Sequence, residues 1–252
     1  MSVKQLKELN SLKIKLVKQL LEMPASTPSV AVQYEFAIKN LELDVYMEKL
    51  VLMVEVLKKD DANIAKMLLE RMLIKKIPGF CQEVVESAKM LEVDLDELKM
   101  MSCSKAVRTH LKKRIVSVQG KRLAAKMMLG SKAGVLLMDY EYEGKIKKYL
   151  IEMEFGEARV IFMLRAKMIP TKENFRGRWA SQECSFCSQL ETDMHLFSCC
   201  GYIDLLGDVN YWALIRLQAS GDEMSRGARR LMRAIERLEL VHRDDVLANV
   251  IA

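Results

Sequence analysis

Two cysteines, a histidine and a third cysteine near the C-terminus constrain this chain more than any other feature. Cys184-x-x-Cys187 is followed by His195 and then by Cys199. Thiolate sulfur and neutral imidazole nitrogen are the ligands that tetrahedral Zn²⁺ selects. A Cys-x-x-Cys pair forms a tight knuckle around one ion, and residues four apart, such as His195 and Cys199, share one face of a helix. The spacing predicts one structural zinc site, because four protein ligands leave no open position for catalysis.

Two other interpretations of these residues are less consistent with the sequence. Free Cys is often a small buried hydrophobe, but four of the six Cys lie between Cys184 and Cys200. A disulfide needs an oxidising compartment, whereas the charged N-terminus has no apolar signal segment. We therefore expect an intracellular protein of the nucleus or cytoplasm. Cys200 competes with Cys199 for the fourth ligand position, and we prefer Cys199 because it keeps the i, i+4 relation to His195.

The composition favours helices. The 252 residues include 18 Met but only 11 Gly and 4 Pro, and chains rich in Leu, Met, Lys and Glu with few breakers favour helix. No apolar run reaches the roughly 18 residues that a bilayer requires, so we expect no membrane partner. The prediction is an all-α fold: an irregular multi-helix bundle with a small CCHC zinc-binding module near the C-terminus.

Helical periodicity covers most of the chain and suggests two regions. In the first region, residues 1–135, we expect helices at 1–22, 29–39, 43–58, 62–74, 80–91, 94–101 and 104–129. The second region, residues 136–252, should contain Arg-rich helices, the zinc module at about 176–204 and C-terminal helices. Its expected helices are 145–153, 156–168, a short one at 171–175, 209–219 and 223–242.

Basic residues are concentrated in two stretches. The net charge is +6, yet residues 103–138 contain no Asp or Glu, and residues 159–178 contain only Glu173. Acid-free basic runs suit a phosphate backbone; the alternative is a solvated helix face neutralised by acids from elsewhere in the fold. The expected phosphate contacts are Arg165, Lys167, Lys172, Arg176 and Arg178, with help from Lys105, Arg108, Lys112 and Lys126.

Two aromatic residues near the cysteines are candidates for stacking on an unpaired base. They are Trp179 and Phe186, and base stacking on aromatic rings is common in single-strand recognition. For Trp179 the alternative is packing beside the zinc site.

The segment from Met163 to Trp179, MLRAKMIPTKENFRGRW, forms a distinctive pattern with the residues C-terminal to it. These are Cys184, Cys187, Glu191-Thr192, His195-Leu196-Phe197 and Cys199. This order resembles the zinc-binding segment that follows the polymerase domain in LINE-type (non-LTR) retrotransposon reverse transcriptases. That family shows an Arg-rich helix, a Pro-Thr turn, Cys-x-x-Cys, an acidic-Thr pair, His-Leu and a last Cys. Here Cys200 stands where the family usually has Pro. Residues 20–28, LLEMPASTP, and the helices after them resemble the thumb-like region that follows the palm.

The resemblance implies a nucleic-acid-binding C-terminal part of such a reverse transcriptase, which grips template RNA or single-stranded or target DNA. A polymerase domain would be a further partner. We expect no enzyme activity, because the family's aromatic-x-Asp-Asp hairpin, which holds two Mg²⁺, is not found. Asp60-Asp61 and Asp244-Asp245 lack strand-forming runs on both sides. The alternative function is a zinc-stapled helical protein-interaction module, with Met-rich helix surfaces supplying an adaptable groove.

Overall fold

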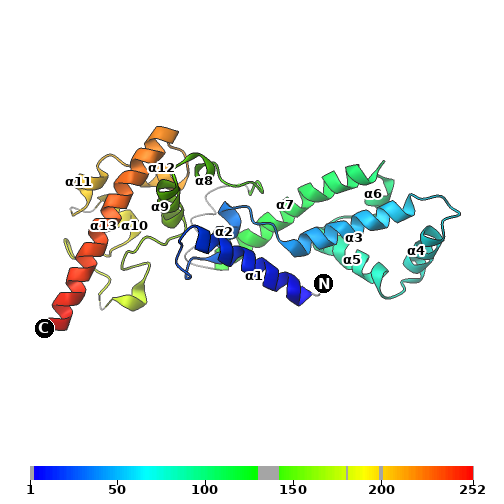
Figure 1. Cartoon of the computed structure of the whole chain (residues 1–252), viewed down its shortest axis with the longest axis horizontal. Helices are drawn as coiled ribbons and strands as arrows, with labels where there is room; N and C mark the ends of the chain where they lie inside the picture. Colours follow the sequence, from blue (N-terminus) through cyan, green and yellow to red (C-terminus); the bar gives the residue numbers. More distant parts are fainter. Residues whose placement is uncertain (1–2, 130–141, 180, 199–200, 252) are drawn as a thin grey trace. The chain divides into compact units, whose positions relative to one another are not determined.

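The computed structural model describes residues 3–129, 142–179, 181–198 and 201–251 (Figure 1). Within these ranges the chain forms helices and no strand, and its one β-type pairing is an isolated antiparallel bridge between Glu183 and Leu190. The all-α prediction is confirmed for the described residues. None of the helices in these ranges is both long enough and apolar enough to cross a membrane.

The chain divides into two compact units. Unit 1 contains the described residues of 1–17, 38–125 and 141–144, and unit 2 contains those of 18–37, 126–140 and 145–252. Two unit boundaries fall near the C-terminal ends of long helices, α1 (Val3–Leu20) and α7 (Ser104–Leu129). The boundary at 135/136 that the sequence suggested lies outside the described residues.

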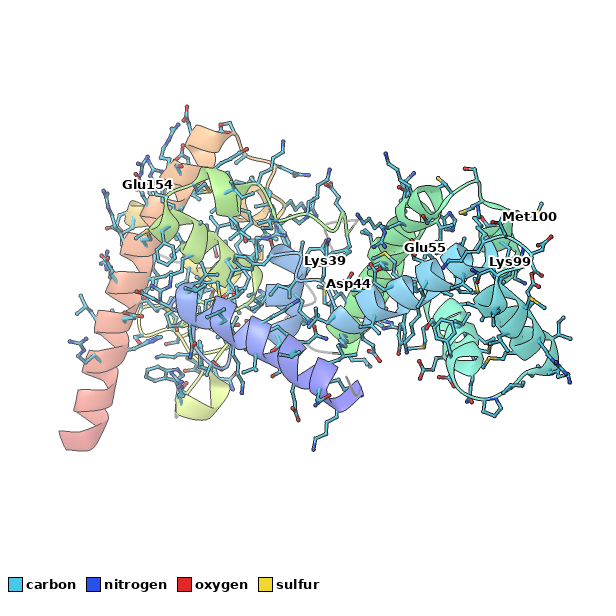
Figure 2. The ribbon with its side chains drawn as sticks, turned by 45° about the vertical axis from the view of Figure 1, so that its right-hand side comes forward. Lys39, Asp44, Glu55, Lys99, Met100 and Glu154 are labelled. Atoms are coloured by element: carbon cyan, nitrogen blue, oxygen red, sulfur yellow. The ribbon has the colours of Figure 1, made fainter. Side chains whose placement is uncertain are left out.

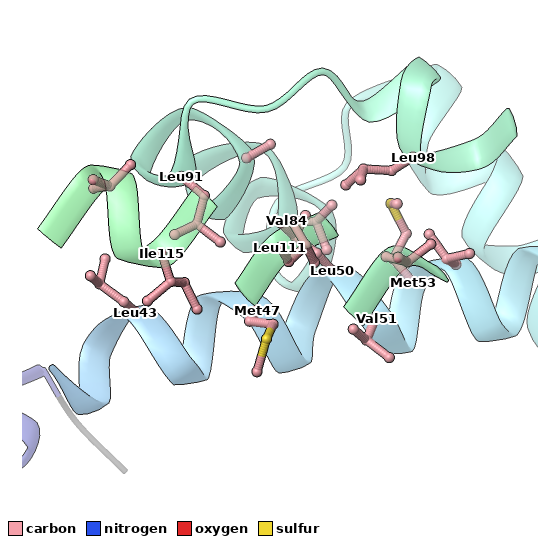
Figure 3. Close-up of a cluster of buried hydrophobic side chains, with 14 of the residues drawn as sticks. Leu43, Met47, Leu50, Val51, Met53, Val84, Leu91, Leu98, Leu111 and Ile115 are labelled. Atoms are coloured by element: carbon pink, nitrogen blue, oxygen red, sulfur yellow. The ribbon is translucent and has the colours of Figure 1, made fainter. Parts of the chain in front are cut away.

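Unit 1 is built around helix α3, which packs mainly on α5 and α4. Its core consists of buried aliphatic and Met side chains, among them Leu43, Leu50, Leu91 and Leu111 (Figure 3). Charged side chains such as Glu55 lie on the surface (Figure 2). The other helices of this unit, besides α1 and α7, are α3 (Leu41–Leu57), α4 (Ile64–Lys75), α5 (Phe80–Leu91) and α6 (Leu95–Met100).

Side-chain caps determine where three of these helices begin. Asn40 accepts a hydrogen bond from the Glu42 backbone N–H at 3.0 Å, and Asp94 accepts one from the Asp96 N–H at 2.8 Å. Asn63 caps α4 in the same way. Each cap satisfies an N–H group that has no partner within the first helical turn.

Unit 2 is organised by the long helix α13, against which α9 and α11 pack. Apolar residues at helical spacing, including Met224, Ala228, Leu231 and Leu238, bury one face of α13. Residues 171–175, predicted as helix, form turns instead. The helices of unit 2 are α2 (Ser29–Glu35), α8 (Tyr149–Glu152), α9 (Phe155–Arg165), the 3₁₀ turn η2 (Arg176–Arg178), α10 (Asp193–Ser198), α11 (Ile203–Leu206), α12 (Tyr211–Ile215) and α13 (Gly221–Ile251).

Candidate metal centre

Cys184 and Cys187 lie on a loop that turns back on itself. The Cys184 N–H donates to the Gln189 carbonyl at 2.7 Å, and the Ser188 N–H donates to the Cys184 carbonyl at 2.9 Å. Ser188 takes a left-handed backbone conformation (φ 57°) that allows this closure. The Phe186 N–H points at Cys184 Sγ, 3.5 Å away. This loop is the knuckle that the sequence predicts, and it directs a backbone N–H at one of its two sulfurs.

Helix α10 brings His195 to the knuckle. Its start is fixed by Thr192, whose Oγ1 accepts a hydrogen bond from the His195 N–H at 2.9 Å. His195 Nε2 lies 3.4 Å from Cys187 Sγ. The ligand atoms of Cys184, Cys187 and His195 all lie within 4.8 Å of one another, so the group can hold a metal ion. Cys199 and Cys200 are outside the described residues.

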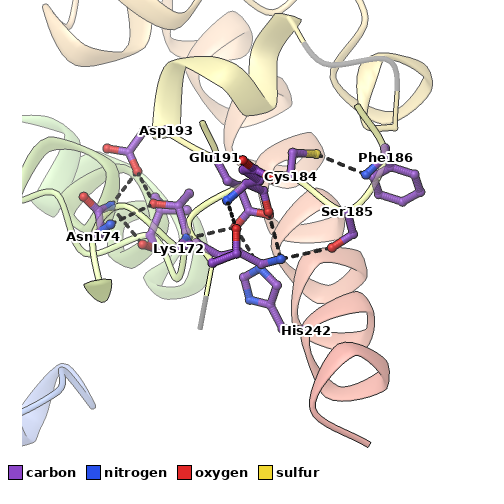
Figure 4. Close-up of polar contacts among 12 residues, drawn as sticks. Lys172, Asn174, Cys184, Ser185, Phe186, Glu191, Asp193 and His242 are labelled. Carbon is purple, nitrogen blue, oxygen red and sulfur yellow. Dashed lines mark hydrogen bonds and ion pairs between the residues drawn. The ribbon is translucent and has the colours of Figure 1, made fainter. Parts of the chain in front are cut away.

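Lys172 supports the knuckle from inside the protein. Its side chain is buried, and Nζ donates to the Glu183 carbonyl at 2.9 Å and to Ser185 Oγ at 3.1 Å (Figure 4). Its backbone N–H donates to Glu191 Oε1 at 2.9 Å. This corrects the expectation that Lys172 contacts phosphates, because its ammonium is enclosed and already has protein acceptors.

Glu191 connects the metal module to helix α13. It is fully buried, and its Oε1 lies 2.7 Å from His242 Nε2. His242 in turn packs against Trp179, with ring centroids 4.4 Å apart. Trp179 therefore packs beside the module, which is the alternative to base stacking. No sequence pattern singled out His242, since its partner lies 51 residues earlier in the chain.

A second buried carboxylate, Asp193, organises the turn before η2. Asn174 Nδ2 donates to Asp193 Oδ1 at 2.6 Å, and Lys167 Nζ lies 3.1 Å from Asp193 Oδ2. Burial raises the pKa of Asp193, although Lys167 opposes this shift. Burial alone would lower the pKa of Lys167, but Asp193 and Tyr211 outweigh it and the pKa is raised. The half-buried Lys167 is thus held by this network and has little freedom to contact a phosphate.

Arg165 is the most completely buried of the predicted phosphate contacts. Its side chain is 1% exposed, and Nη2 lies 2.8 Å from Glu35 Oε1, whose side chain has no exposure. The Tyr149 hydroxyl donates to the other carboxylate oxygen of Glu35 at 3.2 Å. Arg165 therefore pairs two helices of unit 2, α9 and α2, and the expectation that it contacts phosphates is corrected.

The remaining predicted contacts differ in how accessible they are. Arg178 is exposed, with its guanidinium 4.8 Å from the Phe175 ring centroid. For Arg176 the structure describes the backbone of η2 but not the side chain. Phe186, at the tip of the knuckle, is 43% exposed.

Helix α7 presents both free and neutralised cations. Lys105, Lys112 and Lys126 are exposed, and within the described part of the chain they form no ion pair. Arg108 pairs with Glu48 of α3. Arg108 is thus neutralised by an acid from another helix, as the second interpretation of the acid-free run expects, and phosphate contact by the three lysines stays a prediction.

Comparison with protein-family models, with curated proteins and with solved structures found no match to this chain. The resemblance to LINE-type reverse transcriptases stays a prediction from the motif.

Proposed function

We propose that the group formed by Cys184, Cys187 and His195 holds one structural Zn²⁺, completed by Cys199. Two sulfurs and one imidazole nitrogen match the donor preference of zinc. The N–H group directed at Cys184 Sγ and the burial of Cys184 and His195 support a closed, structural site. When bound, zinc would tie the knuckle to helix α10.

Metal analysis tests this assignment directly. The purified chain should carry about one equivalent of zinc. Cys199→Ser should lose most of the metal and Cys200→Ser should retain it. The reverse pattern would make Cys200 the fourth ligand, and a folded module without metal would contradict the proposal.

We further propose that the chain binds nucleic acid, as the thumb-like and zinc-binding C-terminal part of a retroelement reverse transcriptase would. The observation that carries this proposal is that three lysines of α7, Lys105, Lys112 and Lys126, are exposed and form no ion pair with the residues that the structure describes. Lysines without acidic neighbours are available to replace the counterions of a phosphate backbone. The cationic contribution of residues 165–172 is smaller than the sequence suggested, because Arg165 and Lys172 are buried.

Binding to labelled RNA and DNA, measured over a range of salt concentrations, tests the nucleic-acid proposal. Phosphate neutralisation makes affinity fall steeply as salt rises. Affinity that does not depend on salt, or no binding to any nucleic acid, would contradict it.

An observation on α4 supports the alternative of a protein-interaction module. Four apolar side chains of this short helix are more than half exposed: Ile64 (73%), Met67 (56%), Leu68 (56%) and Ile74 (81%). Met100 of α6 is 85% exposed (Figure 2). Clustered exposed apolar residues commonly mark protein contacts. Under this alternative Ile64→Glu with Ile74→Glu would abolish partner binding and leave nucleic-acid binding at the parent level.

A further inference from the structure

At the tip of the knuckle an aromatic ring lies next to an arginine of helix α13. Phe186, between the two cysteines, is 43% exposed. The Arg237 guanidinium lies 5.8 Å from the centroid of its ring. Tyr202, which is fully buried, contacts the ring edge-on with centroids 5.4 Å apart. Phe186 is therefore packed on part of its ring against Tyr202 and Gly201, and the rest of its surface is exposed next to a cation.

Arg237 is the last of four arginines that follow one stripe of α13. The spacing of four, three and four residues places them on the same face of a helix. This stripe lies beside the buried face that carries Ala228 and Leu231, and Arg230 and Arg237 are partly buried. At about 1.5 Å per residue the stripe is roughly 16 Å long. Its members are Arg226, Arg230, Arg233 and Arg237.

The four arginines are not equally engaged. Arg226 and Arg233 are exposed and form no hydrogen bond or ion pair with the residues that the structure describes. Arg230 pairs with Asp208. Arg237 pairs with Asp204, its Nη1 lying 3.1 Å from Oδ2. Asp204 is 64% exposed at its side chain, and such an exposed ion pair is weak enough for a phosphate to displace it.

We propose that Phe186 and this arginine stripe form a binding surface for an unpaired segment of nucleic acid, a surface that rests on the proposed nucleic-acid function and extends it to unit 2. One base stacks on the part of the Phe186 ring that is exposed, and the flanking phosphates pair with the arginines. An exposed aromatic ring alone is common on protein surfaces. The guanidinium beside the ring and the arginine row leading away from it are the combination that single-strand recognition uses.

The ion pair with Asp204 gives the proposal a test in which binding should become tighter. Asp204→Asn removes a negative charge and frees Arg237, so affinity for a labelled single-stranded oligoribonucleotide should rise several-fold at low salt. Glu152→Gln removes one exposed carboxylate from α8 of the same unit and is the matched control. An equal rise in both variants would show a general charge effect and overturn the assignment of this surface.

Stacking is tested separately with Phe186→Leu, which keeps an apolar side chain against Tyr202. Its affinity should fall roughly fivefold or more while the salt slope stays unchanged. Phe186→Trp should restore binding. Zinc content, measured in every variant, shows whether the knuckle is intact.

The choice of probe distinguishes the possible ligands. Phe186→Leu should bind both single-stranded RNA and single-stranded DNA more weakly than the parent, and the larger loss identifies the preferred type of nucleic acid. A duplex of the same sequence should show no loss. An equal loss with the duplex would contradict base stacking.

If the parent binds with a steep salt dependence but neither Asp204→Asn nor Phe186→Leu changes the affinity, this surface is wrong and the proposed function stands. If the parent does not bind at all, the proposed function fails as well.

Discussion

The ammonium of Lys172 donates a hydrogen bond to Ser185 Oγ at 3.1 Å, within the loop that carries both cysteines. The same ammonium donates to the Glu183 carbonyl, one residue before Cys184. Lys172, for which the charge pattern predicts phosphate binding, thus stabilises the loop that carries the cysteines of the candidate metal centre. Residues that orient the ligands of a metal commonly affect its affinity.

Lys172→Met should therefore weaken zinc binding and leave the salt dependence of nucleic-acid affinity unchanged. Methionine keeps the apolar stem but removes the donors, and loss of a supporting contact of this kind typically costs about tenfold in metal affinity or more. Competition with a zinc chelator measures the change. Lys148→Met, at an exposed lysine of the same unit, is the control. A reduced salt slope together with parental zinc affinity would restore the phosphate role of Lys172.

Breaking the buried pair between Arg165 and Glu35 should destabilise unit 2 strongly. Arg165→Ala leaves the Glu35 carboxylate buried without its cation, which costs roughly 3–5 kcal/mol in comparable cases. The double change Arg165→Met with Glu35→Leu should recover most of this loss, because apolar residues of similar volume often replace a buried ion pair. Urea unfolding measures both variants. A stability of Arg165→Ala equal to the parent would disprove the structural role.

Removing the metal should change the environment of Trp179. Trp179 packs on His242, which reaches the module through Glu191. Chelation should loosen this contact and shift the Trp179 emission to longer wavelength. Trp212→Phe makes Trp179 the sole tryptophan, because the chain has only two. Cys184→Ser should show the shifted emission without chelator, whereas Cys103→Ser, at an exposed cysteine outside the module, should behave as the parent. Emission that does not respond to chelation in the parent would speak against metal at this site.

Helix positions were largely predictable because they depend on local signals. The periodicity located α5, and α7 begins and ends where the sequence predicted. The predicted helix at 171–175 was wrong for a physical reason: Thr171 Oγ1 accepts from the Asn174 N–H at 3.3 Å. Such a side-chain bond stabilises a turn in competition with helix.

The accessibility of the cations was not predictable in the same way. Arg165 finds its carboxylate 130 residues away, at Glu35, and Lys172 is enclosed by a loop that folds over it. A charge run shows which residues are basic but not which acids the fold brings to them. The cysteine spacing was more informative, because a knuckle and one helical turn are short-range structures that place Cys184, Cys187 and His195 together.

The exposed lysines of α7 give the last prediction. Replacing Lys105, Lys112 and Lys126 together by Ala should weaken binding to RNA and single-stranded DNA and lower the salt slope by up to about three. The fold should survive, because these side chains are exposed and alanine favours helix. The control is a triple alanine variant at three exposed lysines of α1, Lys7, Lys13 and Lys15, which removes the same charge. A general effect of net charge would lower affinity equally in both triple variants, whereas direct phosphate contacts predict a lower slope only for the α7 variant. If the α7 variant keeps the parental affinity and slope, these lysines are a solvated helix face and do not contact the nucleic acid.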